Sequence, residues 1–352
     1  MLSIINANII APRGVKRGNI FIKQGKIIDV TFGRKKYFAD KTIDAKGNFA
    51  SPGFIDLHIH GDAETISKTQ LRSGTTGFLK AIYAASKYKT EQYKTGTLCL
   101  GINMEGPFIN KKMRGALPAK FIKKPVLKYA TEIITQARGT LKIMTIAPEV
   151  PGNYEIINLL RKHGIMPSIG HTDSDFTQAK KAVEQGARYA THVFNRMRGL
   201  SQREPGALGA VLEDDRVVAE IVLDGKHVHP ACFRILLKTK GSDRIVLATD
   251  SVACGPIPGS RRKGIFFILK DGTYAGSALT MNQAVKNAVK FGGISIHEAV
   301  KMATLNPAKV LGISNKKGTI EKGKDADIII FDGALDIKTA IVNGHIVYNK
   351  LG

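Results

Sequence analysis

Six side chains that can bind a metal ion accompany apolar runs of strand length. The first run carries His58 and is followed by His60. Positions i and i+2 of a strand point to the same side, so both imidazoles can face one metal ion. Each of four later runs has a single carboxylate or imidazole in or after its last residues, namely Glu105, His171, His192 and Asp250. Imidazole and carboxylate ligands together suit Zn, Fe, Mn, Co or Ni, and the sequence does not choose among these metals.

Each of these residues also has an ordinary structural interpretation. A single His-x-His is weak evidence for a metal, Glu105 before Gly-Pro could begin a turn, and Asp250 could cap a helix. As a set they are more informative, because they come from the same end of five different apolar runs. A chance arrangement would scatter them over both ends of the runs, so the set predicts one metal site.

The middle of the chain must position these residues, and there apolar runs alternate with helical patterns. Eight runs are predicted as strands, over Phe54–Ile59, Thr76–Ile82, Leu98–Met104, Lys142–Ala147, Met166–Ile169, Tyr189–Phe194, Ala219–Leu223 and Ile245–Thr249. Amphipathic helices are predicted over Val126–Ala137, Tyr154–His163, Phe176–Gln185, Pro230–Lys238, Thr280–Phe291 and Ile296–Ala303. This α/β alternation predicts a (β/α)8 TIM-type barrel, whose active site lies at the carboxyl ends of the strands. A doubly wound open sheet is the structural alternative, disfavoured by the lack of an early G-x-G-x-x-G turn.

Both ends of the chain have the pattern of β-structure. Lys23-Gln24-Gly25 predicts a hairpin between two strands near the N-terminus, and Asn343-Gly344 suits a two-residue type I′ turn near the other end. We therefore predict a small β-sandwich domain made of residues 1–50 plus 313–352. The barrel domain would occupy residues 51–312.

The chain has 352 residues, which suits one barrel and a modest extra unit. It contains 53 Lys and Arg residues against 29 Asp and Glu residues, a net charge of +24. The basic residues form short scattered groups, such as Arg34-Lys35-Lys36 and Arg261-Arg262-Lys263. Because a single basic stripe interleaved with aromatic residues is missing, we expect a solvated surface and no nucleic-acid partner.

The cysteines and the chain start bear on the cellular compartment. Cys99, Cys232 and Cys254 are widely spaced and form no C-x-x-C pair, which argues against a disulfide framework and fits a reducing compartment. The first residues lack the pattern of a signal peptide. No apolar run approaches the roughly 20 residues of a membrane span. We therefore expect a cytoplasmic protein without a membrane partner.

Longer motifs surround the candidate ligands in a fixed order. They are Pro52–Gly61, Met104–Phe108, Gly170–Thr172, Thr191–Asn195, Arg203–Gly206, Asp224–His227, Ala248–Asp250 and Ala275–Met281. In this order they resemble the N-acetylglucosamine-6-phosphate deacetylase family within the amidohydrolase superfamily. The likeness extends to residues 323–327, whereas the opening motif alone would indicate only the superfamily.

The resemblance implies a metal cofactor. Glu105, His171 and His192 match the main metal ligands of the family. His58 and His60 match a pair that holds a second metal ion in some members. The chain is thus expected to bind one or two divalent ions per subunit, with Zn as the first expectation and Fe, Mn, Co or Ni as alternatives.

The resemblance also implies a substrate and its contacts. Asp250 matches the catalytic acid/base. The remaining matches hold the sugar phosphate or line the pocket, and they are Ala116, Asn195, Arg196, Arg203, His227, Tyr274, Ala275 and Gly276. The implied reaction is hydrolysis of N-acetylglucosamine 6-phosphate to glucosamine 6-phosphate and acetate. The implied assembly is a homodimer, in which the partner chain reaches toward the phosphate.

The chain departs from the family at some of these positions. Leu117 stands where the family usually has a histidine that polarises the substrate, and Arg196 replaces a small residue. Leucine can pack against an acyl methyl group, while arginine could clasp the phosphate or exclude the sugar. These two residues favour an alternative, an amidohydrolase of another N-acyl substrate such as a different acetamido-sugar phosphate. A degenerate homologue that only binds ligands is a further alternative, disfavoured by the intact set of ligands.

Overall fold

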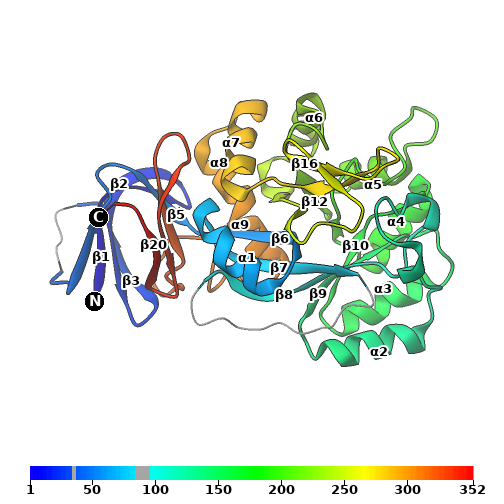
Figure 1. Ribbon diagram of the computed structural model, residues 1–352, viewed down its shortest axis with the longest axis horizontal. Helices are drawn as coiled ribbons and strands as arrows, with labels where there is room; N and C mark the ends of the chain where they lie inside the picture. Colours follow the sequence, from blue (N-terminus) through cyan, green and yellow to red (C-terminus); the bar gives the residue numbers. More distant parts are fainter. Residues whose placement is uncertain (34–36, 84–95, 352) are drawn as a thin grey trace.

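The computed structural model describes residues 1–33, 37–83 and 96–351. Two sheets organise these residues, one of 12 strands and one of eight. Figure 1 shows the eight-stranded sheet, which combines strands from both ends of the chain, beside the larger unit of strands and helices. The basic group Arg34–Lys36 lies outside the described residues.

Eight parallel strands lie side by side in chain order within the larger sheet. They are β6 (Phe54–Gly61), β7 (Thr75–Tyr83), β8 (Leu98–Glu105), β9 (Leu141–Ile146), β10 (Met166–Ile169), β11 (Tyr189–Ala190), β12 (Val218–Val222) and β13 (Ile245–Ala248). All eight predicted runs are in this row. The sixth strand is much shorter than predicted, because the chain turns after Ala190 with positive φ at His192 and Phe194.

The two ends of this row meet, so the sheet is curled. The backbone N–H of Asp250, just after β13, donates to the carbonyl oxygen of His58 in β6 at 2.8 Å. The hydroxyl of Thr249 donates to the buried carboxylate of Asp56 at 2.6 Å. The next strand, β14 (Ser251–Cys254), then pairs in parallel with β6. This junction brings the side chain of Asp250 beside the histidines of β6.

Three further strands extend the sheet beyond β14, and they were not predicted from the sequence. They are β15 (Arg261–Lys263), β16 (Phe266–Ile268) and β17 (Tyr274–Ser277). Of these, β17 pairs with β14, while β16 pairs antiparallel with both β17 and β15. Because β17 lies next to β14, it places Tyr274 and the following residues at the same end of the sheet as Asp250.

Helices follow most of the parallel strands and pack against the sheet. They are α1 (Ala63–Thr69), α2 (Leu127–Ala137), α3 (Asn153–Lys162), α4 (Phe176–Gln185), α5 (Gly206–Glu213), α6 (Pro230–Lys240), α7 (Met281–Gly292), α8 (Ile296–Ala303) and α9 (Leu305–Val310). Short 3-10 helices cover Gln70–Ser73, Lys111–Met113, Ala119–Phe121 and Ser242–Arg244. Among the described residues, no helix is both long and apolar enough to span a bilayer.

The strands bury side chains on both of their faces. Met144 and Ile146 lie on one face of β9 and belong to the large core that includes the helices. Ile143 lies on the other face and belongs to a second cluster. That second cluster also contains Leu57 and Tyr189, from strands elsewhere in the row. Burial on both faces explains why the strands are nearly continuous apolar runs in the sequence.

Helix prediction succeeded where one face is apolar or where the ends carry capping residues. A capping box begins α8, in which the side chains of Ser295 and Glu298 each accept from the other's backbone N–H. The helices α1, α5 and α9 were missed. In α5 the residues Gly206–Val211 are all buried, so the sequence shows no helical period there.

The smaller sheet joins strands from the two ends of the chain. Its strands are β1 (Leu2–Ala11), β2 (Gly14–Lys23), β3 (Lys26–Thr31), β4 (Lys41–Asp44), β5 (Phe49–Pro52), β18 (Ile328–Phe331), β19 (Ile337–Val342) and β20 (His345–Asn349). The antiparallel pair β5–β18 connects the N-terminal strands to the C-terminal ones. The predicted turn between β19 and β20 has φ values of 47° at Asn343 and 78° at Gly344, as a type I′ turn requires.

Candidate active site

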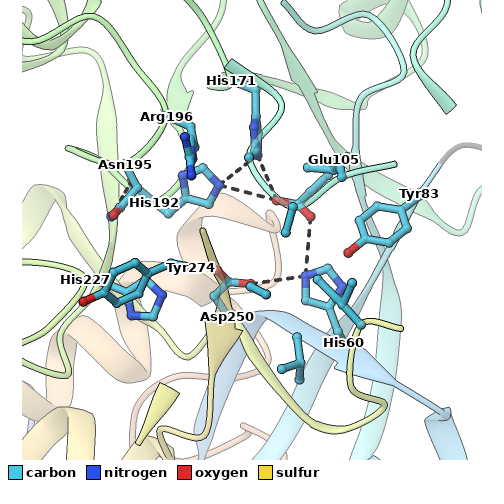
Figure 2. Close-up of a pocket in the computed structure, with 17 residues that line it drawn as sticks. His60, Tyr83, Glu105, His171, His192, Asn195, Arg196, His227, Asp250 and Tyr274 are labelled. Carbon is cyan, nitrogen blue, oxygen red and sulfur yellow. Dashed lines mark hydrogen bonds and ion pairs between the residues drawn. The ribbon is translucent and has the colours of Figure 1, made fainter. Parts of the chain in front are cut away.

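A pocket opens at the carboxyl ends of the parallel strands, as Figure 2 shows. Most residues predicted for the site line it, namely His60, Glu105, Ala116, Leu117, His171, His192, Asn195, Arg196, His227, Asp250, Tyr274, Ala275 and Gly276. His58 is fully buried next to His60 and Asp250, so it does not line the pocket itself. Arg203 is exposed in the segment before α5 and is not part of the lining.

The first cluster of metal-binding side chains consists of Glu105, His171 and His192, all of them buried. Oε1 of Glu105 lies 3.2 Å from Nε2 of His171 and 3.4 Å from Nε2 of His192. The two imidazole Nε2 atoms are themselves 3.1 Å apart. Three potential ligand atoms therefore converge on one point.

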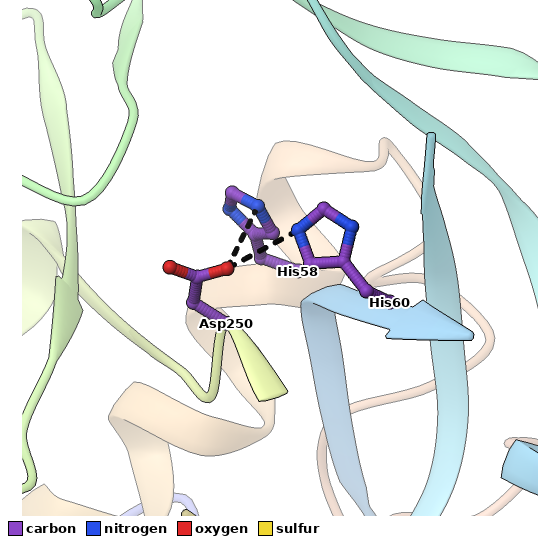
Figure 3. A group of neighbouring side chains, drawn as sticks. All are labelled: His58, His60 and Asp250. Carbon is purple, nitrogen blue, oxygen red and sulfur yellow. Dashed lines mark ion pairs between the residues drawn. The ribbon is translucent and has the colours of Figure 1, made fainter. Parts of the chain in front are cut away.

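The second cluster consists of His58, His60 and Asp250 (Figure 3). Oδ1 of Asp250 lies 3.2 Å from Nε2 of His60 and 3.5 Å from Nε2 of His58. Glu105 links this cluster to the first, because its Oε2 lies 3.4 Å from Nε2 of His60 while its Oε1 faces the other histidines. The Glu105 carboxylate is therefore placed to serve both clusters.

The hydrogen bonds behind the ligands indicate which ring nitrogen faces the site. Nδ1 of His171 lies 2.8 Å from the carbonyl oxygen of Met113, which can only accept, so Nδ1 carries the proton. Nδ1 of His58 lies 2.8 Å from Oε1 of the fully buried Glu220, which leads to the same conclusion. In both rings it is Nε2 that then faces the cluster. Outer partners of this kind orient histidine ligands in metal sites.

The donor set fits a divalent transition metal. Nε2 of His58 and Nδ1 of His192 are buried without a hydrogen-bond partner among the described residues. A cation between the rings would compensate the close approach of the Nε2 lone pairs of His171 and His192. Imidazole and carboxylate ligands in this number suit Zn and the other metals predicted from the sequence.

The two carboxylates of the clusters are ionised at neutral pH. Burial raises the pKa of Glu105, but the nearby imidazoles of His58 and His171 lower it more, and the net pKa lies well below its usual value. Burial likewise raises the pKa of Asp250, which His58 and His60 then lower below its ordinary value. Asp250 can therefore act as a proton acceptor.

The backbone is strained where the strands deliver these side chains. His171, His192 and Asp250 have φ values of 48°, 29° and 46°, in the left-handed region that non-glycine residues rarely adopt. Each residue closely follows a strand, so the turn redirects the side chain into the pocket. Strain of this kind persists where the surrounding structure enforces it, and it clusters at functional sites.

Further polar side chains line the pocket outside the two clusters. Nδ1 of His227 lies 2.6 Å from Oδ2 of Asp224, while its buried Nε2 has no hydrogen-bond partner among the described residues. Tyr274 packs edge-on against the His227 ring at 5.0 Å. Asn195 and Arg196 lie nearby at the pocket wall (Figure 2). These side chains offer hydrogen bonds and charge to a polar substrate.

An apolar wall borders the pocket as well. Ala116, Val252, Ile257 and Ala275 belong to one hydrophobic cluster, and Leu117 is buried at the pocket lining. Gly276, at φ 92°, allows β17 to approach closely, because a Cβ there would lie 2.5 Å from Val252. The wall suits a small apolar group such as an acyl methyl.

Sequence reasoning missed three polar residues of the site. Glu220 and Asp56 are charged residues inside otherwise apolar strands, and that unusual position was the available signal. Oε1 of Glu220 also accepts from the backbone N–H of His192 at 3.0 Å, so one carboxylate holds ligands of both clusters. Tyr83 ends β7 and lines the pocket. Its position at the carboxyl end of a predicted strand was the available signal.

Known proteins resemble this chain over nearly its whole length. Residues 49–347 match the Amidohydrolase family. The N-acetylglucosamine-6-phosphate deacetylase of Bacillus subtilis is 33% identical over 370 residues, covering 95% of this chain and 93% of that protein. The crystal structure of N-acetylglucosamine-6-phosphate deacetylase from Pasteurella multocida has a TM-score of 0.91 at 28% identity, covering 99% and 100% of the two chains. A mutant of the Mycobacterium smegmatis enzyme in complex with N-acetyl-D-glucosamine-6-phosphate has a TM-score of 0.88 at 27% identity, covering 99% of both chains.

Proposed function

This chain belongs to the amidohydrolase family, and on that premise we propose that it hydrolyses N-acetylglucosamine 6-phosphate to glucosamine 6-phosphate and acetate. It is a metal-dependent hydrolase that acts on an amide bond. The observation that carries the proposal is the position of Asp250 beside the imidazole–carboxylate clusters, within a pocket that also offers polar groups to a sugar phosphate.

For the metal, we assign one position to Glu105, His171 and His192 and a second to His58 and His60. Zn is the first choice of metal, and the contact of Glu105 with both clusters supports two ions per subunit. When bound, such an ion lowers the pKa of water toward neutrality and polarises a carbonyl group. Metal analysis of purified protein that found less than one ion per chain would contradict this assignment.

Asp250 moves the proton in the proposed reaction. Its carboxylate accepts a proton from the attacking water as that oxygen bonds to the acetamide carbon. It then returns the proton to the nitrogen, because an amine anion is too basic to leave unaided. Glu105 and Glu220 keep the histidines oriented while this happens. Leu117 and its neighbours pack against the acetyl methyl group and exclude water.

Arg196 is assigned to the phosphate group. Its side chain lies at the pocket rim against Gly115, and it has no acidic partner among the described residues. We expect Arg196→Ala to raise the KM for the sugar phosphate about 10- to 100-fold with little change in kcat. The reason is the loss of one hydrogen bond to a charged group, which contributes about 1.5–3 kcal/mol to binding. Steady-state kinetics would show this.

Two comparisons make the Arg196 prediction specific. The exposed Arg138→Ala removes the same charge far from the pocket and should leave the KM unchanged. Hydrolysis of unphosphorylated N-acetylglucosamine should be equally slow in wild type and Arg196→Ala. An unchanged KM in Arg196→Ala would show that this arginine does not contact the phosphate.

Arg203 is the one predicted phosphate contact that lies outside the pocket of its own chain. We propose that it serves the neighbouring subunit of a homodimer. Arg203 is exposed in the segment before α5, so in a dimer it could reach the pocket of the other subunit. Sedimentation equilibrium that returned a monomer at assay concentration would contradict it.

We also keep the architecture predicted from the sequence as a proposal. Residues 51–312 would form a (β/α)8 TIM-type barrel, and residues 1–50 plus 313–352 a β-sandwich domain. The row of eight parallel strands and the hydrogen bond between Asp250 and His58 support the barrel. A cytoplasmic location goes with this function, and cell fractionation that placed the protein elsewhere would contradict it.

The proposed substrate is tested by the release of free amine from three compounds, using protein of known metal content. We expect N-acetylglucosamine 6-phosphate to react fastest, ahead of the N-acetylgalactosamine isomer and of unphosphorylated N-acetylglucosamine. Leu117 and Arg196 favour the second candidate, another acetamido-sugar phosphate. Preference for the galactosamine isomer would establish that candidate, and no turnover of any of the three would contradict both.

A further inference from the structure

The hydroxyl of Tyr83 is a hydrogen-bond donor that the reaction as described above does not use. Tyr83 ends β7 and stands in register with Glu105 at the end of the neighbouring strand β8. It lines the pocket, and Figure 2 shows its hydroxyl turned toward the centre of the site. Among the described residues, this hydroxyl has no hydrogen-bond partner.

The ring of Tyr83 is held from both sides. It packs at 5.6 Å against the ring of His60 and stacks at 5.9 Å on the ring of Phe121. A half-buried aromatic ring between two others has few alternative positions, so the direction of the hydroxyl is set before a ligand binds. Preorganised donors of this kind are effective in stabilising developing charge.

A tyrosine hydroxyl is a hydrogen-bond donor at neutral pH. The carboxylates of Glu105 and Asp250 are engaged with the imidazoles of the clusters. The hydroxyl is therefore available as a donor to a third partner placed in the pocket.

Several side chains that line the pocket offer no hydrogen bond to an acyl oxygen. Leu117, Ala116 and Val252 are apolar and cannot donate a hydrogen bond. The polar groups Asn195 and His227 lie across the cluster from Tyr83 (Figure 2). A carbonyl group held between the clusters and Tyr83 would have the Tyr83 hydroxyl as a neutral hydrogen-bond donor.

We propose that Tyr83 is a catalytic residue that donates a hydrogen bond to the amide carbonyl oxygen and stabilises the oxyanion that forms from it. The inference rests on the proposed function, since it assigns a role in that same reaction. Water adds its oxygen to the carbonyl carbon and gives a proton to Asp250, and the π electrons move to the carbonyl oxygen. Tyr83 keeps its proton throughout. The C–N bond then breaks as Asp250 protonates the amine, and the carbonyl re-forms in acetate.

Tyr83→Phe tests this role, because it removes the oxygen and keeps the ring between His60 and Phe121. Loss of one oxyanion donor is expected to lower kcat about 10²-fold. The KM should stay within about twofold if the bond strengthens mainly in the transition state. Metal content and melting temperature should equal those of wild type, which separates a catalytic loss from a structural one.

A tetrahedral analogue gives a second readout that does not depend on turnover. In this analogue a methylphosphonyl group replaces the acetyl group of the substrate. Its affinity for Tyr83→Phe should fall by about the same factor as kcat/KM. The affinity for the product glucosamine 6-phosphate, which lacks the acyl oxygen, should not change. Calorimetric titration measures both.

The outcomes are separable. Tyr129→Phe removes a tyrosine hydroxyl from helix α2, outside the pocket lining, and should match wild type in every assay. The inference is overturned if Tyr83→Phe keeps kcat within about threefold, or if it loses metal in proportion to activity. Wild-type protein that is inactive on all acetamido-sugar phosphates overturns the proposed function instead. That result comes from the wild-type assay alone and does not depend on Tyr83→Phe.

Discussion

Asp250→Asn is expected to lower kcat about 10³-fold, within the range that one general acid–base group contributes. Asparagine has the same shape but does not accept a proton at neutral pH, so the attacking water and the leaving amine lose their proton carrier. The carboxylate lies 3.2 Å from Nε2 of His60, within the second cluster. The measurement is the rate of amine release under substrate saturation, with the metal content determined in the same preparation.

A matched variant controls for the loss of one carboxylate charge. Asp243→Asn changes an exposed aspartate paired with Lys301, far from the pocket, and should keep wild-type kcat. An Asp250→Asn protein with full metal content and kcat within tenfold of wild type would rule out Asp250 as the proton carrier. Full metal content together with the predicted loss would separate proton transfer from metal binding.

Glu105→Gln is expected to release the metal ion and to abolish turnover. The Glu105 carboxylate faces the imidazoles of four histidines, with Oε1 toward His58, His171 and His192 and Oε2 toward His60. A neutral amide would remove the negative charge and turn an N–H₂ group toward lone pairs. Removing an outer partner of a metal ligand already costs about 10- to 100-fold, so the loss of a ligand should exceed about 10²-fold in affinity and in activity.

The ion is counted by mass spectrometry after dialysis, alongside the assay of amine release. Glu155→Gln, an exposed glutamate in the first turn of α3, is the control and should bind metal like wild type. Retention of the full metal content by Glu105→Gln would contradict the assignment of Glu105 as a ligand. Restoration of activity by excess metal would show that weaker affinity, rather than misfolding, explains the loss.

The sequence alone determined the row of eight parallel strands, six of the helices and the members of the two clusters. Buried parallel strands must be apolar on both faces, so runs such as Leu98–Met104 identify them without knowledge of the fold. A polar residue close after such a run must lie at the carboxyl end of its strand, and the carboxyl ends of parallel strands meet at one end of the sheet. This is why Glu105, His171 and Asp250 could be named as partners before any contact between them was known.

Local turn chemistry was determined in the same way. The positive φ values at Asn343 and Gly344 follow from the tolerance of these two residues for left-handed backbone. The capping box of α8 depends only on Ser295 and Glu298, three residues apart. Such features were predictable because all of their interactions lie within a few residues of the chain.

Only the tertiary structure decided which distant side chains meet. Glu220 reaches His58 across 162 residues of sequence, and Tyr83 stands beside Glu105 because of the register between β7 and β8. Arg203 looked like a pocket residue, yet its segment lies outside the pocket of its own chain. Strand periodicity tells which way a side chain points, but register and sheet curl determine what it contacts, and both depend on the packing of the whole chain.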